Sequence, residues 1–188
     1  MKKNLEYLLK AVSPFDPKNV ERIIAAFHPR VVKKNQVLLS AGEVCNEFYF
    51  VNKGCLRTYF ITKQGHEKTR YIILDPSIGT AFTSFISQKP SFEYVDAIEK
   101  TELLVIKHTD FYRLAKEIPQ WKDFYIKILE MAYSFQNTKI ETLVTLTAKQ
   151  RYDLLYKENP KLVKRLSNKM LASYLDITQE TLSRLKSA

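Results

Sequence analysis

Six short runs of strand-forming residues between positions 36 and 107 limit the fold of this chain more than any other feature. The runs read QVLLS, EFYFV, CLRTYFI, EKTRYIIL, EYVDAI and ELLVIK. Turn-forming residues separate them, and no helical pattern lies between them. Strands at this spacing predict an antiparallel β-barrel or jelly roll.

Helical patterns lie on both sides of the strand region, so we expect an α+β fold. Residues 4–28 form a helical region, with Asp16 as an N-cap and Pro17 at the first helical position. A short helix over 108–117 and a long helix from Pro119 follow the strands. We therefore expect three segments, which are a jelly-roll domain (1–118), a long helix (119–146) and a second helical domain (147–188).

The apolar runs are too short for a membrane span. The longest uncharged ones are of the order of Phe48–Val51 and Tyr71–Leu74, whereas a transmembrane helix needs about 20 residues. Glu6 and Lys10 interrupt the apolar residues near the N-terminus, which argues against a signal peptide. We expect a cytoplasmic protein with no membrane partner and with free thiols at its two cysteines.

Basic residues are concentrated toward the C-terminal end. The chain has a formal net charge of +10, and residues 147–188 contain nine basic and four acidic residues. A dense basic segment attracts polyanions, and DNA is a common one. A solvated helical surface has the same charge pattern, so charge alone leaves both interpretations open.

The long helix has apolar residues at the three- and four-residue intervals that are typical of a coiled-coil seam. We expect this face to join two copies of the chain into a homodimer, because a helix that extends past a barrel needs a partner to bury its second side. Packing of the same face against the jelly roll of its own chain is the alternative. The residues expected at the dimer seam are Trp121, Phe124, Ile128, Met131 and Phe135.

The segment 167–188 predicts two short helices joined by a turn. Asp176 falls where the turn needs a left-handed backbone, which aspartate tolerates. The second helix is expected from Gln179 to Lys186, as in a helix-turn-helix, although an ordinary helical hairpin has the same spacing. The apolar residues of the shared seam are Leu171, Leu175, Ile177, Leu182 and Leu185.

The polar residues of this segment have the chemistry that DNA recognition needs. Glutamine can bind adenine, glutamate can accept from cytosine, and arginine can bind guanine through two hydrogen bonds. Hydroxyl and amino groups at helix starts can reach phosphates. The candidate DNA-binding residues are Ser167, Lys169, Thr178, Gln179, Glu180, Ser183, Arg184 and Lys186.

The order of helix, strands, long helix and helix-turn-helix resembles the Crp/Fnr family of bacterial transcription regulators. The tail LASYLDITQETLSRLK is similar to the signature of that family, and KQRYDLLYKENPKLVKRLS resembles the linker helices of Bacteroidetes-type members. The resemblance implies a homodimeric DNA-binding regulator in which Gln179, Glu180 and Arg184 contact bases. Gln179 replaces a common arginine and Asp176 a common glycine, and little room remains before Ala188 for the wing of the family.

The resemblance also implies a cyclic-nucleotide-type pocket, which needs a Gly-Glu pair and a later arginine. Here Gly79 precedes Thr80, and the arginine position falls at or beside Ser91. Both charged groups are absent from these positions, so we expect no tight binding of cAMP or cGMP. The pocket would hold another, unknown small effector or none. Its candidate residues are Gly79, Thr80, Ala81, Phe82, Ser91 and Phe92.

Other functions have less support in the sequence. The three histidines are roughly forty residues apart, which does not fit a metal-dependent barrel enzyme, and we expect no metal, no cofactor and no catalytic residue. No Walker loop, glycine-rich dinucleotide turn or G-x-S-x-G sequence is present. The main alternative is a cyclic-nucleotide-type barrel whose helical tail binds a protein partner in place of DNA.

Overall fold

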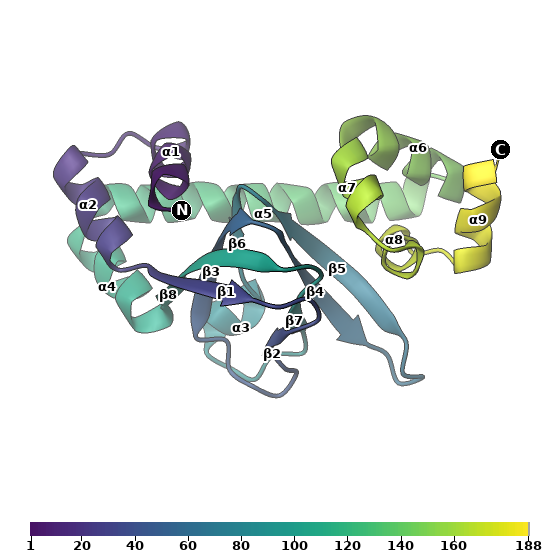
Figure 1. The fold of residues 1–188 in the computed structure, drawn as a ribbon, viewed down its shortest axis with the longest axis horizontal. Helices are drawn as coiled ribbons and strands as arrows, with labels where there is room; N and C mark the ends of the chain where they lie inside the picture. Colours follow the sequence, from purple (N-terminus) through teal and green to yellow (C-terminus); the bar gives the residue numbers. More distant parts are fainter. Residues whose placement is uncertain (188) are drawn as a thin grey trace.

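Two antiparallel four-stranded sheets form the centre of the computed structural model, which describes residues 1–187 (Figure 1). The strands are β1 (His28–Val32), β2 (Val37–Leu39), β3 (Glu47–Lys53), β4 (Cys55–Ile61), β5 (Glu67–Leu74), β6 (Ser77–Gly79), β7 (Tyr94–Ala97) and β8 (Thr101–Lys107). Their orders in the two sheets are β1-β8-β3-β6 and β2-β7-β4-β5. This is an open jelly roll within an α+β fold, as the spacing of the apolar runs predicts.

The helices lie on both sides of the jelly roll. They are α1 (Lys2–Val12), α2 (Pro17–Ala25), α3 (Phe82–Ser87), α4 (His108–Glu117), α5 (Pro119–Thr145), α6 (Ala148–Glu158), α7 (Pro160–Arg165), α8 (Asn168–Leu175) and α9 (Gln179–Ser187). Figure 1 shows α5 running the length of the molecule, with α1, α2 and α4 near its start and α6–α9 grouped at its other end.

All six predicted strands are present, whereas β1, β6 and α3 have no counterpart in the prediction. The single helical region expected over 4–28 is two helices, because Ser13 leaves the helix in an extended conformation before Pro14 and Pro17. The capping prediction is confirmed, since the Asp16 carboxylate accepts a hydrogen bond from the Lys18 N–H at 2.8 Å.

The first half of α5 belongs to the protein core, which corrects the prediction that it forms the dimer seam. Trp121, Phe124 and Ile128 are at most 6% exposed and pack in the hydrophobic cluster of their own chain. The Trp121 indole N–H donates to the Phe111 carbonyl at 3.0 Å. Aromatic residues at this end of α5 cover the interior of the fold, so these three side chains are unavailable to a second copy.

Candidate nucleic-acid interface

Helices α8 and α9 form the predicted helix-turn-helix. Leu171, Ala172, Leu175 and Leu182 are at most 5% exposed and share one hydrophobic cluster. Asp176 joins the helices with φ of 55° and ψ of 48°, the left-handed conformation expected for the turn. The two helices are therefore held by a common apolar seam, which fixes the direction of α9.

The outward face of α9 is polar and exposed. Gln179, Glu180, Ser183, Arg184 and Lys186 are all exposed, whereas Leu182 between them is fully buried. The Lys186 ammonium donates to the Asn168 side chain at 2.6 Å. Within residues 1–187, no hydrogen bond or ion pair engages the side chains of Gln179, Glu180 or Arg184. These three side chains are free to meet an external partner.

Three further candidate residues lie at helix starts. Ser167 caps α8 by accepting a hydrogen bond from the Met170 N–H at 3.3 Å, and Thr178 accepts one from the Thr181 N–H at 3.1 Å. Lys169 is exposed, with its ammonium 3.6 Å from the Glu67 carboxylate. The start of α8 therefore presents a lysine beside backbone N–H groups, a combination that suits a phosphate.

The helix-turn-helix is docked on the jelly roll through β5. Ser173 on α8 accepts a hydrogen bond from the Thr69 N–H at 2.7 Å and donates to the Glu67 carbonyl at 2.9 Å. Arg165 forms ion pairs with both Asp75 and Glu99. Three residues of the jelly roll also join the hydrophobic cluster of the helix-turn-helix, namely Cys55, Ile72 and Ile98. The orientation of α9 is thereby fixed relative to the jelly roll.

Lys139 on α5 lies at the centre of this junction. Its ammonium donates to the carbonyls of Arg70 at 2.7 Å and Thr69 at 3.2 Å, and it lies 4.3 Å from the centre of the Tyr174 ring. Burial lowers the pKa of Lys139 to about 8. One side chain therefore connects the long helix, β5 and α8.

A stripe of exposed apolar residues, hereafter the α5 stripe, runs along the long helix from Ile126 to Val144. Ile126, Tyr133 and Ile140 recur every seven residues, and Val144 follows one turn later; they are 44%, 70%, 58% and 80% exposed. Seven residues make close to two helical turns, so the four side chains lie on one side of α5. Met131 is also exposed but lies off this line, and Phe135 packs edge-on against Tyr71 within the chain.

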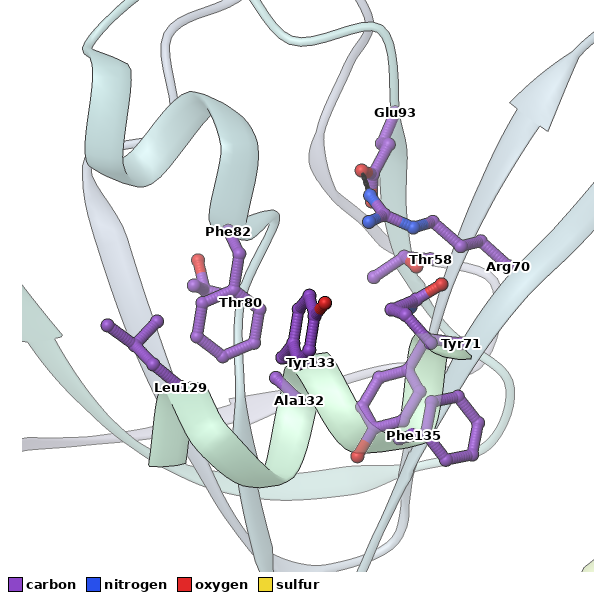
Figure 2. Close-up of a pocket in the computed structure, with 11 residues that line it drawn as sticks. Thr58, Arg70, Tyr71, Thr80, Phe82, Glu93, Leu129, Ala132, Tyr133 and Phe135 are labelled. Atoms are coloured by element: carbon purple, nitrogen blue, oxygen red, sulfur yellow. Dashed lines mark hydrogen bonds and ion pairs between the residues drawn. The ribbon is translucent and has the colours of Figure 1, made fainter. Parts of the chain in front are cut away.

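A cavity of about 220 Å³ lies between the jelly roll and α5. Its lining residues are Thr58, Arg70, Tyr71, Thr80, Phe82, Glu93, Leu129, Ala132, Tyr133, Phe135 and Gln136. Figure 2 shows Arg70 meeting Glu93 on one side and residues of α5 forming another. Burial lowers the pKa of Arg70, although its guanidinium pairs with the Glu93 carboxylate.

Only part of the predicted pocket lines this cavity. Thr80 and Phe82 do, but Gly79, Ala81, Ser91 and Phe92 do not, which corrects the prediction for those four residues. Phe92 is 84% exposed on a loop. Ser91 is buried and bonds to its own loop, accepting from the Glu93 N–H at 2.9 Å and donating to the Glu93 carbonyl at 3.0 Å.

Sequence reasoning missed Thr58, Arg70 and Glu93 as pocket residues. Thr58 pairs with Tyr71 and Tyr59 with Thr69, so Arg70 is an extra residue in β5. This β-bulge lets two consecutive residues, Arg70 and Tyr71, both line the cavity. In a regular strand consecutive side chains point to opposite faces, so Arg70 and Tyr71 would not be expected to line the same cavity. Nothing in the local sequence marks the bulge.

Comparison with known proteins agrees with this architecture. Residues 29–117 match the cyclic nucleotide-binding domain family. FixK2 from Bradyrhizobium japonicum superposes with a TM-score of 0.75 at 18% identity, over 86% of this chain and 83% of its own. The domain match covers the jelly roll, and the superposition shows that the two chains share a fold. The c-di-GMP-responsive regulator CLP of Xanthomonas campestris also has a TM-score of 0.75, at 16% identity, over 92% of this chain and 90% of its own.

Among curated proteins, the Anaerobic regulatory protein of Pasteurella multocida (strain Pm70) is 24% identical over 166 residues. This match covers 82% of this chain and 60% of that protein. The match to the similarly named protein from Haemophilus influenzae covers 82% of this chain and 63% of that protein. The chain thus spans less than two thirds of the length of these regulators. These two curated relatives and CLP are regulators by name.

Other kinds of site are not formed by the described residues. In residues 1–187, His, Cys, Asp and Glu side chains do not gather in groups of three or more that could hold a metal ion. None of the helices in the same range is long and apolar enough to cross a membrane. Cys45 and Cys55 are free and buried, as expected for thiols outside a disulfide, and burial raises the pKa of Cys55 to about 12.

Proposed function

We propose that this chain is a homodimeric, sequence-specific DNA-binding transcription regulator that acts in the cytoplasm. The observation that carries the proposal is the outward face of α9, where Gln179, Glu180 and Arg184 are exposed and unpaired within residues 1–187. An α-helix fits the major groove, and these side chain types are the ones that bind adenine, cytosine and guanine edges there. The segments 1–118, 119–146 and 147–188 then act as sensor, dimer helix and DNA-binding domain.

The α5 stripe supports the dimer. Its residues are apolar, exposed and aligned over about five turns of helix. A parallel second copy of α5 would cover the stripe in both chains at once, because a two-fold interface uses the same residues on each side. Such a dimer presents two α9 helices to half-sites about 34 Å apart on one face of the DNA.

Selection of bound fragments from a random duplex pool tests the proposal. The unmodified chain is expected to enrich one palindromic sequence. Arg184→Ala is expected to lose the preference at one base pair in each half-site, a change of about 1–3 kcal/mol, because arginine binds guanine through two hydrogen bonds. Arg113→Ala is the matched control, since Arg113 is an exposed arginine on α4 at the opposite end of the molecule.

The same experiment separates DNA binding from protein binding by the helical tail. If the tail contacts phosphates, affinity for duplex DNA falls steeply between low and physiological salt. A tail that binds a protein would enrich no sequence and show no such salt dependence. An Arg184→Ala variant with unchanged affinity and an unchanged selected sequence would contradict the role given to α9.

A further inference from the structure

The polar groups in the wall of the cavity beside α5 indicate which chemical class of ligand fits it. Arg70 and Glu93 are the charged residues among those that line it, and they form an ion pair with each other (Figure 2). Glu93 is only 4% exposed. The wall is therefore electrically neutral although it contains two charges.

A charged ligand that separates this pair leaves a charge without its partner. An anion that draws Arg70 away would leave the Glu93 carboxylate buried and unpaired, whereas the Arg70 side chain is 27% exposed and keeps some contact with water. Removal of one partner from a buried ion pair is strongly unfavourable, because the remaining charge stays out of water without compensation. An uncharged ligand can occupy the cavity while the pair remains intact.

The rest of the wall is apolar and largely aromatic. Tyr71, Phe82 and Phe135 contribute rings, and Leu129 and Ala132 contribute aliphatic surface from α5. Aromatic walls favour flat ligands that stack against a ring or meet its edge. The cavity measures about 220 Å³, whereas a dry apolar cavity of about 150 Å³ already holds benzene.

We infer that this cavity binds an uncharged, flat aromatic molecule. The inference names the effector of the proposed regulator but does not require DNA binding. Its test uses ligand binding alone, so its failure would leave the role of α9 to be judged separately.

Benzamide, benzoate and benzamidine test the charge argument. They share one ring and nearly one shape, and at neutral pH they carry no charge, a negative charge and a positive charge. Binding to the full chain is measured by ligand-detected NMR and calorimetry, with cAMP included for comparison. We expect benzamide to bind at least tenfold more tightly than either charged compound, a difference of about 1.4 kcal/mol. Equal or tighter binding of benzoate, benzamidine or cAMP would overturn the inference, as would the absence of benzamide binding at millimolar concentration.

Discussion

Replacement of Ile140 by aspartate is expected to dissociate the dimer. Ile140 lies in the middle of the α5 stripe and is 58% exposed in the single chain. Full burial of an isoleucine side chain stabilises by about 1.5–3 kcal/mol, so burial of the exposed part against a second copy contributes about 1–2 kcal/mol. A two-fold dimer contains the contact twice, which makes the contribution about 2–4 kcal/mol.

This free energy corresponds to a dimer dissociation constant about 30- to 800-fold higher, since each 1.4 kcal/mol is a factor of ten. The aspartate adds repulsion between two like charges at the interface, so the expected weakening is a lower bound. Sedimentation equilibrium over a range of protein concentrations measures the constant directly. Far-UV circular dichroism of the variant checks that the helices remain folded.

Met131→Asp is the matched control. Met131 is 62% exposed on the same helix. It follows Ile126 by five residues, so it lies more than a third of a turn around the helix from the α5 stripe. It also belongs to the face that the apolar spacing of α5 first indicates as the dimer seam. Dissociation by Met131→Asp with an intact Ile140→Asp dimer would refute the role of the stripe, and a monomeric unmodified chain would refute the dimer itself.

Two further predictions concern the helix-turn-helix and its junction with the jelly roll. Leu182→Ala removes a fully buried side chain from the seam of α8 and α9, and chemical denaturation is expected to show a loss of about 2–5 kcal/mol of stability. Lys139 should make stability rise from about pH 8 to pH 10, because its folded-state pKa is about 8 while the unfolded chain keeps the proton to about pH 10.4. Denaturation of the chain and of Lys139→Met at several pH values checks this, and an identical rise in both would contradict it.

The sequence predicts the local features of this fold well. Alternating apolar runs with turn residues between them locate six strands, and the caps at Asp16 and Ser167 are where short-range chemistry requires them. The left-handed turn at Asp176 is equally local, since it depends on one residue between two helices. Such features depend on neighbours within four residues, so the order of residues is enough to find them.

Features that depend on distant contacts are not predictable in this way. The apolar spacing of α5 identifies Trp121 and Ile128 as buried but does not say whether the same chain or a second copy covers them. Glu93 meets Arg70 from 23 positions away, and the bulge that directs Arg70 inward depends on its pairing with β4. The sequence around Ser91 contains no sign of the ion pair between Arg70 and Glu93.

Strand β5 connects the candidate effector cavity with the candidate DNA-binding helices. Arg70 lines the cavity through its side chain, while its carbonyl accepts the hydrogen bond from Lys139. The preceding residue, Thr69, holds Ser173 of α8 through its N–H. Because Arg70 is the extra residue of the bulge, no residue of β4 lies directly opposite it. A ligand that packs against the Arg70 side chain therefore contacts the same short segment that positions α8, and with it the direction of α9.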